Sequence, residues 1–213
     1  MNVSQLAAPA SADGQIGERA VDLVFAVSGT RLPAGYASAL WEALVGRLPW
    51  LAHEPGVGVH AIRSPSDGAG LLLSRRARLA LRLPSRRQAD ALRLTGECLE
   101  VEGERLEVGA ARARALEPYP TLSARFVATG AVDELSHQEA VAAMLVAIGM
   151  PLRFICGRMR TVRTGGTTVS GAEVVMHELR PEQSLAMQQH GLGGERHLGC
   201  GLFLPHKTIS DID

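Results

Sequence analysis

Two pairs of glycines close to the C-terminus have a spacing that could hold a ligand. The pairs are Gly191-Leu-Gly193 and Gly199-Cys-Gly201, and five residues separate them. Because glycine has no side chain, its backbone can approach a ligand closely and present amide donors to it. A turn without a ligand would explain one or two glycines, but four in this paired arrangement indicate a binding loop.

Two common phosphate-binding motifs do not fit this loop. A dinucleotide-binding motif runs from strand through glycines to helix, whereas here a predicted helix precedes the glycines and a strand follows them. A P-loop continues from its last glycine into Lys-Ser or Lys-Thr and a helix, whereas Lys207-Thr208 stand beyond a strand and a proline. His197 and Cys200 are only two potential metal ligands, so we expect no metal and no cofactor.

The distribution of charge, rather than its sum, is compatible with a nucleic-acid partner. The 22 basic and 22 acidic residues cancel, and Lys207 is the only lysine. Arginines cluster in SRRARLALRLPSRR and RFICGRMRTVR, whereas acidic residues cluster in GECLEVEGERLEV. A neutral protein with segregated charge can present a basic face, and the planar guanidinium binds phosphate well. The alternative is that these arginines only keep strand faces solvated.

Length and composition indicate a soluble globular protein of one domain or two small ones. The chain has 213 residues, of which 46% are hydrophobic and 21% charged. Residues 1–19 lack the pattern of a signal peptide and are expected to form a flexible tail. The longest apolar run is well short of the roughly 20 residues that span a bilayer. With three widely spaced cysteines, a cytoplasmic protein without disulfides fits best.

The hydrophobic pattern predicts one order of elements twice, on either side of a linker at 117–121. This order is strand, helix, strand, strand, helix, strand, which is a ferredoxin-like unit. We therefore predict an α+β fold of two tandem ferredoxin-like (βαββαβ, RRM-like) domains, at 20–116 and 117–213, with a C-terminal glycine-rich loop at 191–201. The predicted strands are 20–28, 57–64, 77–84, a hairpin at 99–108, 122–130, 152–164, 167–179 and 201–209. The predicted helices are 33–48, 85–94, 136–148 and 181–190.

The glycine loop in this setting resembles the G-rich loop of the RAMP superfamily. There the loop lies between the last helix and the last strand of a C-terminal ferredoxin-like domain. Within the superfamily the chain is most similar to the CRISPR repeat-processing endoribonucleases, in particular to a short subfamily. The residues that carry the resemblance are VDLVFAVSGTRLP, PGVGVHAIR and GLGGERHLGCGLFLPHK. The resemblance covers nearly the whole chain after the tail and implies that the loop holds RNA.

The resemblance also implies a reaction without metal. The 2′-hydroxyl beside the scissile phosphate attacks it, which leaves a 2′,3′-cyclic phosphate and a 5′-hydroxyl. Related enzymes place a histidine in or just after the first helix, often with a tyrosine in that helix, and histidine suits acid-base catalysis near neutral pH. His53 and His60 both qualify as the base, and the choice between them stays open. Tyr36 matches the tyrosine loosely, because its place on an apolar stripe also fits a core residue.

The implied partners are the stem-loop of CRISPR repeat RNA, which we expect the protein to keep after cleavage, and other subunits of an interference complex. The alternative is a non-catalytic guide-RNA-binding subunit of the same superfamily. A small-molecule-binding protein of this fold would leave the paired glycines unexplained. Besides Arg196 and His197, which could contact phosphate or supply an acid, the expected RNA-contacting residues are Gly191, Gly193, Gly194, Gly199, Gly201, Lys207, Arg158, Arg160, Arg86 and Arg87.

Overall fold

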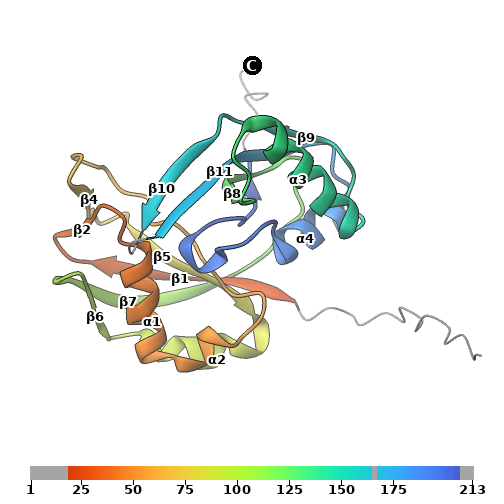
Figure 1. The fold of residues 1–213 in the computed structure, drawn as a ribbon. Helices are drawn as coiled ribbons and strands as arrows, with labels where there is room; N and C mark the ends of the chain where they lie inside the picture. Colours follow the sequence, from red (N-terminus) through yellow and green to blue (C-terminus); the bar gives the residue numbers. More distant parts are fainter. Residues whose placement is uncertain (1–18, 165–166, 207–213) are drawn as a thin grey trace, which may run out of the picture.

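The computed structural model describes residues 19–164 and 167–206, which form two units stacked one above the other in Figure 1. Each unit has an antiparallel sheet and helices. Nearly all of the predicted tail at 1–19, and Lys207, lie outside the described residues. In the described part of the chain, no helix is long and apolar enough to cross a membrane.

The first unit is built on a five-stranded sheet with the order β3-β5-β1-β7-β6. Its strands are β1 (Ala20–Ser28), β3 (Gly58–Val59), β5 (Arg78–Pro84), β6 (Cys98–Val101) and β7 (Glu104–Ala115). Its helices are α1 (Ala37–Arg47), α2 (Gln88–Ala91), and the 3-10 helices η1 (Pro49–Ala52), η2 (Ser85–Arg87) and η3 (Leu92–Leu94). A small separate sheet pairs β2 (Arg31–Pro33) with β4 (Gly70–Leu72).

Alternation along β1 determines which side of this sheet is covered by helices. Leu23 and Phe25 are fully buried in one core with Leu40 and Leu44 of α1. Successive residues of a strand point to opposite faces of the sheet, so Asp22 lies on the face away from α1. That second face of the sheet is the one turned toward the C-terminal unit.

The second unit repeats the element order. Its sheet has the order β10-β11-β8-β12, and β9 also pairs with β11. The strands are β8 (Leu122–Ala128), β9 (Phe154–Cys156), β10 (Arg160–Thr164), β11 (Thr167–Met176) and β12 (Leu204–Pro205). The helices are α3 (Glu134–Ala147), α4 (Pro181–His190) and the 3-10 helix η4 (Arg196–Leu198). The predicted order of strands and helices is thus present in both halves of the chain.

One strand of the first unit is much shorter than predicted. The sequence predicts a strand over 57–64, but β3 contains only Gly58 and Val59. The backbone N–H of His60 still donates to the carbonyl of Ala80. The chain then leaves the sheet, and the N–H of Ile62 donates to the hydroxyl of Tyr36 at 2.7 Å. His60 therefore stands where the strand ends, against the first turn of α1.

Two predicted helices also differ from the observed ones. The helix predicted over 85–94 is broken into three short helices, η2, α2 and η3. The N-cap of α3 is Asp133, whose carboxylate accepts a hydrogen bond from the N–H of Ser136. Asp133 therefore starts α3 one turn before Ser136, the first residue of the predicted helix.

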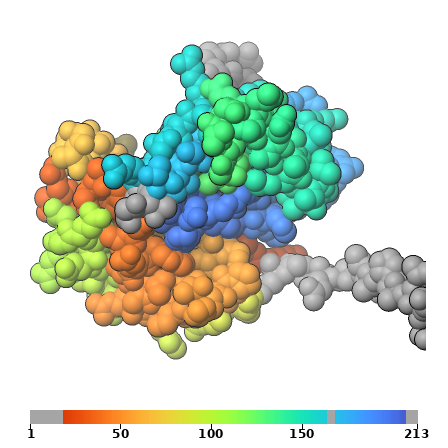
Figure 2. All heavy atoms as spheres, viewed as in Figure 1, coloured from red at the N-terminus to blue at the C-terminus, as the bar shows by residue number. Residues whose placement is uncertain are grey.

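The segment between α4 and β12 joins the two units. Figure 2 shows it in blue, filling the space between the α1 region below and the second sheet above. Its predicted strand over 201–209 is reduced to Leu204 and Pro205 among the described residues. Gly201 lies outside β12, although its N–H donates to the carbonyl of Phe126 on β8 at 2.7 Å, in line with the register of β12 and β8.

Candidate active site

A row of charged residues crosses the face of the first sheet that meets the second domain. Asp22 on β1 is the register partner of Arg82 on β5 and of Arg114 on β7. Arg82 donates from Nε to Oδ1 of Asp22 at 2.8 Å and from Nη2 to Oδ2 at 3.0 Å. Arg114 donates from Nη2 to the same Oδ2 at 3.0 Å. Asp22 and Arg82 are both fully buried, whereas the side chain of Arg114 is largely exposed.

Arg82 also ties the two domains together. Its Nη1 donates to two carbonyl oxygens of the second domain, those of Gln188 and Phe203, each at 2.9 Å. Gln188 lies in α4 and Phe203 lies just before β12. A buried charge needs a charged partner and hydrogen bonds at its remaining polar atoms. Asp22 of the first domain is the charged partner of Arg82, and the two carbonyl oxygens of the second domain accept its remaining hydrogen bonds.

His60 reaches Asp22 from the end of β3. Its Nε2 lies 3.1 Å from Oδ1 of Asp22, and its side chain is only 10% exposed. Burial lowers the pKa of His60 below its ordinary value, and the hydrogen bond to Asp22 opposes that effect without cancelling it. Burial alone would raise the pKa of Asp22, but the hydrogen bonds from His60 and Arg82 hold it well below its usual range. These shifts favour a neutral imidazole against an ionised carboxylate.

Tyr36 and His197 lie at the same place as His60. The three side chains line one small pocket between the end of β3, the start of α1 and η4. Burial raises the pKa of Tyr36, although the hydrogen bond from Ile62 opposes this effect. The ring of His197 lies 5.1 Å from the ring of Trp41 on α1. The structure thus brings together three residues that the sequence singles out separately.

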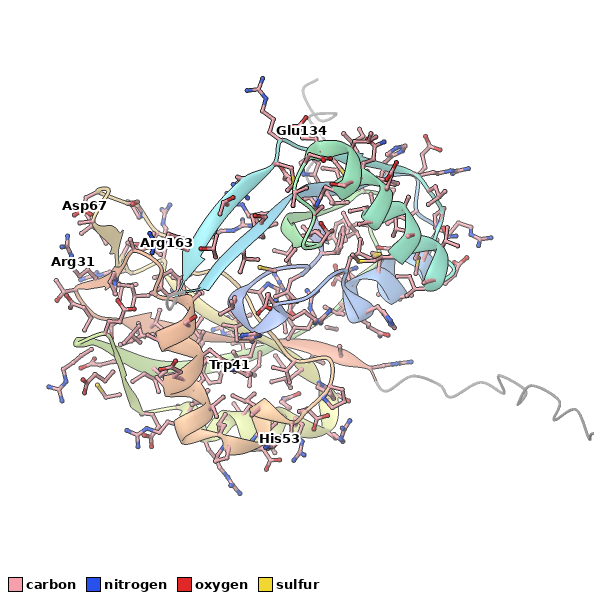
Figure 3. The ribbon with its side chains drawn as sticks, in the orientation of Figure 1. Arg31, Trp41, His53, Asp67, Glu134 and Arg163 are labelled. Carbon is pink, nitrogen blue, oxygen red and sulfur yellow. The ribbon has the colours of Figure 1, made fainter. Side chains whose placement is uncertain are left out.

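His53 lies elsewhere. It follows η1 at the far end of α1, and Figure 3 shows it near α2, away from the second domain, whereas Trp41 lies beside the loop between the domains. Its side chain is exposed. No hydrogen bond or ion pair links its imidazole to another described residue. His53 and His60, which the sequence leaves as alternative bases, therefore lie in different parts of the structure.

A basic groove opens from His60 along the junction of the domains. Its volume is about 500 Å³. The first sheet contributes Ala80 and Val24 to its floor, and the second domain contributes Gly199 and Leu202 to its other wall. No acidic residue lines it in the described part of the chain. The charged residues that line it are Arg63, Arg76, Arg78, Arg114 and Arg125.

The four paired glycines share an unusual backbone conformation. Gly191, Gly193, Gly199 and Gly201 all have positive φ values, which side-chain-bearing residues rarely adopt. A Cβ on Gly201 would lie 2.0 Å from the carbonyl oxygen of Leu192, and one on Gly193 would lie 2.4 Å from that of Ala128. A Cβ on Gly199 would lie 3.2 Å from the carbonyl oxygen of Val59 in the first domain. The paired glycines thus let the loop fold tightly on the protein itself.

Arg196 in this loop is engaged with backbone rather than open to phosphate. Its guanidinium donates to the carbonyls of Gly56 and Val57 in the first domain and of Gln189 and His190 in α4. Burial, with a contribution from Arg82, lowers its pKa to about 10. Arg196 thus forms a second tie between the domains, a role that its sequence position does not reveal.

Comparison with known proteins identifies the family. The model of the Cas6 Crispr family matches residues 21–208. A CRISPR-associated endonuclease Cas6 from Myxococcus xanthus is 41% identical over 186 residues, which cover 87% of this chain and 81% of the relative. The chain belongs to the Cas6 family. The predicted resemblance to CRISPR repeat-processing proteins of the RAMP type is therefore confirmed.

Solved structures confirm the tandem ferredoxin-like fold. A Cas6-related protein from Pyrococcus furiosus superposes with a TM-score of 0.58 at 13% identity, covering 92% of this chain and all of the other. The structure of a Cas6 product complex superposes with a TM-score of 0.51 at 20% identity, covering 86% of this chain and 98% of the other. At these identities the likeness concerns the fold.

The remaining predicted RNA contacts of this Cas6 protein are scattered. Arg86 and Arg87 both pair with Glu54, at 2.5 and 2.6 Å, near η1 and away from the basic groove. Arg160 donates to the carbonyl of Arg125. Its guanidinium also lies over the ring of Phe126, 5.4 Å from the ring centre. Arg158 is exposed between β9 and β10.

Gly194 differs from the other glycines of this Cas6 loop. It is exposed, and a Cβ there would meet no other atom within 4 Å. Its N–H donates to the carbonyl of Ala128 at 3.3 Å. Gly194 is therefore the glycine of this loop that is exposed to solvent.

The described residues contain no cluster of potential metal ligands. Among these residues, no three His, Cys, Asp or Glu side chains come close enough together to hold an ion. The expectation of a reaction without metal stays a prediction that chelation can test.

Proposed function

We propose that this Cas6 protein is an endoribonuclease that cleaves CRISPR repeat RNA without a metal ion, and that His60 is its general base. The relative from M. xanthus is named a CRISPR-associated endonuclease. The observation that carries the assignment to His60 is its position with Tyr36 and His197 at the end of a groove lined by arginines.

The proposed reaction is a transesterification within the RNA. His60 accepts the proton of the 2′-hydroxyl while the 2′-oxygen forms a bond to phosphorus. The bond from phosphorus to the 5′-oxygen breaks, and that oxygen takes up a proton. The products are a 2′,3′-cyclic phosphate and a 5′-hydroxyl. The neutral His60 favoured by burial is the form that can accept the first proton.

Tyr36 and His197 can support the reaction from the same pocket. The hydroxyl oxygen of Tyr36 accepts from the N–H of Ile62, so its own proton is free to be donated to a phosphate oxygen. His197 is partly exposed and stands near Glu195, with Nε2 and Oε2 3.5 Å apart. We assign the protonation of the leaving oxygen to His197 and give His53 no part in the chemistry.

The groove is the proposed path of the RNA backbone. Five arginines line it without a carboxylate, and Tyr119 offers an aromatic ring on which a base can stack. Arginine binds phosphate oxygens in pairs, so a strand lying along the junction of the domains would be held on both sides. Arg158, exposed beyond the groove, extends the basic surface toward the repeat stem.

The cellular setting follows from the proposed substrate. The protein would act in the cytoplasm, where the repeat transcript is made. Retention of the cleaved stem would make it a subunit of an interference complex.

Incubation of the purified protein with its own repeat RNA in excess EDTA tests the proposal. We expect one cut per repeat, with a 2′,3′-cyclic phosphate on the upstream product and a 5′-hydroxyl on the downstream one. A strict requirement for added magnesium would overturn the mechanism. Tight binding without any cut would instead identify a non-catalytic RNA-binding subunit.

A further inference from the structure

The contact between Asp22 and His60 also determines which ring nitrogen of His60 carries the proton. An ionised carboxylate can only accept hydrogen bonds, so the Nε2 atom that lies 3.1 Å from Oδ1 of Asp22 must carry the proton. A neutral imidazole has one proton, which leaves Nδ1 with its lone pair. Nδ1 has no hydrogen-bond partner among the described residues.

We infer that Asp22 is a positioning residue that holds His60 in the Nε2–H tautomer with Nδ1 toward the RNA, and that Arg82 locks Asp22 in place through the second domain. This inference rests on the proposed role of His60 as the base. It adds a specific proton location and two residues that do not touch the substrate.

The geometry around Asp22 supports a positioning role. Arg82 binds both carboxylate oxygens, at 2.8 and 3.0 Å, so the carboxylate plane cannot rotate without breaking a bond. Arg114 holds Oδ2 from the other side. Among the described residues, the other hydrogen-bond partner of Oδ1 is His60, whose ring is therefore held in one orientation.

Arg82 couples this arrangement to the docking of the domains. Its Nη1 is bound to the carbonyls of Gln188 and Phe203, so its own position depends on α4 and on the approach to β12. The catalytic pocket is formed by both domains, because His197 comes from the second. The same buried guanidinium therefore aligns the carboxylate behind His60 with the domain that supplies His197.

The surroundings of His60 are otherwise basic. Asp22 is the one carboxylate that faces it among the described residues, and its charge favours the protonated imidazole, whereas Arg82 and Arg114 oppose protonation. The titratable and charged groups that face His60 or line its two pockets are Asp22 (β1), Tyr36 (before α1), Arg63 and Arg76 (between β3 and β5), Arg78 and Arg82 (β5), Arg114 (β7), Arg125 (β8) and His197 (η4). Removal of the Asp22 charge must therefore lower the pKa of His60 further.

The first test uses the wild-type protein, so it does not depend on the folding of a variant. Long-range ¹H–¹⁵N correlation spectra of histidine-labelled protein at pH 7.5 distinguish a protonated from an unprotonated ring nitrogen. The His60 signals are assigned by their absence in His60→Gln. We expect Nε2 to be protonated and Nδ1 unprotonated. The opposite tautomer, or rapid exchange between the two, would overturn the inference even if the enzyme is active.

The second test is the pH dependence of cleavage in Asp22→Asn. We expect the plateau rate to fall by about 10- to 100-fold, as for removal of a residue that orients a catalytic group. We also expect the acid limb of the single-turnover profile to move to lower pH. Glu97→Gln is the matched control, because it removes an exposed carboxylate that pairs with Arg47 at 3.3 Å, away from the groove.

The two tests separate this inference from the proposed function. A wild-type protein that does not cut RNA defeats the proposed function itself. If wild type cuts, His60→Ala does not, and Asp22→Asn loses rate with an unmoved acid limb, Asp22 is merely structural and the inference is wrong.

Discussion

Asp22 and Arg82 stand directly opposite each other on β1 and β5, and both side chains are fully buried. Burying two charges is costly unless their mutual geometry is good and their other hydrogen-bonding positions are filled. Here the guanidinium forms two bonds to one carboxylate and two more to carbonyls of the other domain. The pair is thus a structural centre shared by both domains.

Arg82→Met should destabilise the protein strongly. Methionine fills much of the same volume, but it leaves the carboxylate of Asp22 buried with only His60 and the exposed Arg114. We expect a loss of about 3–5 kcal/mol in the free energy of unfolding, as for breaking one side of a buried ion pair. Urea denaturation followed by circular dichroism measures it.

Arg114→Met is the matched control for that variant. Arg114 binds the same carboxylate, but its side chain is 62% exposed, so its contact is screened by water. A loss of no more than about 1 kcal/mol is expected there. Equal effects of the two substitutions would contradict the view that burial and the contacts with the second domain make Arg82 special.

The sequence predicts the order of elements because that order depends on local patterns. The alternation of β1, the leucine stripe of α1, and Pro181 and Gly191 at the ends of α4 are all read from neighbouring residues. The early end of β3 is not local, because it depends on the bond from Ile62 to the hydroxyl of Tyr36. Chain segments that meet only in the fold set such boundaries.

The site is harder to predict because its parts come from segments far apart in the sequence. Arg82 falls in an alternating strand whose arginines are expected to be solvated, yet it is buried because Asp22 lies opposite. An aspartate inside the otherwise apolar strand AVDLVFAVS was the signal that a buried cation must exist nearby. The groove residues Arg76 and Arg78 fall in an arginine cluster that the sequence shows, but Arg63, Arg114 and Arg125 do not, since only the tertiary fold brings them together.

His60→Ala should slow the chemical step by roughly 100- to 10,000-fold, because it removes the general base. His53→Ala should leave the rate within about twofold of wild type, since its exposed side chain lies away from the groove. Single-turnover cleavage at saturating protein measures both, and affinity for RNA should change little in either variant. A slow His53→Ala beside a normal His60→Ala would reverse our assignment of the base.

Cleavage should persist below the pH at which an ordinary histidine becomes protonated. The base works when it is neutral, and burial lowers the pKa of His60 below 6.5. The midpoint of the fall in the neutral fraction, and with it in the rate, should therefore lie below pH 6.5. Single-turnover rates at subsaturating protein report the free enzyme and measure this midpoint. An acid midpoint of 7 or above would show that a different group, or an imidazole that is not desolvated, controls the rate.

Arg78→Ala should weaken RNA binding in a salt-dependent manner. Arg78 lines the groove, where we place the RNA backbone. Loss of one phosphate contact should reduce the slope of log affinity against log salt by about 0.7 for a single strand. Arg93→Ala, an exposed arginine on η3 outside the groove, is the control. Filter binding across a salt series distinguishes the two, and an unchanged slope for Arg78→Ala would move the RNA path elsewhere.

Substitutions can distinguish the glycines that the fold of the loop requires from the glycine that we expect to approach RNA. Gly201→Ala should destabilise the protein by roughly 1–3 kcal/mol, because a positive-φ position would carry a side chain. The added Cβ would also lie 2.0 Å from the carbonyl oxygen of Leu192. Thermal unfolding measures this effect without any RNA.

Gly194→Val should have the opposite profile. Its φ is not positive, and a Cβ there meets no other atom within 4 Å, so the melting temperature should stay close to that of wild type. If the exposed backbone of the loop approaches RNA, the valine side chain would hold the strand away, and affinity should fall by about tenfold or more. The other glycines of the loop are already explained by contacts within the protein. Unchanged affinity in a stably folded Gly194→Val would therefore mean that the loop does not contact RNA and only positions η4 and His197 against α1.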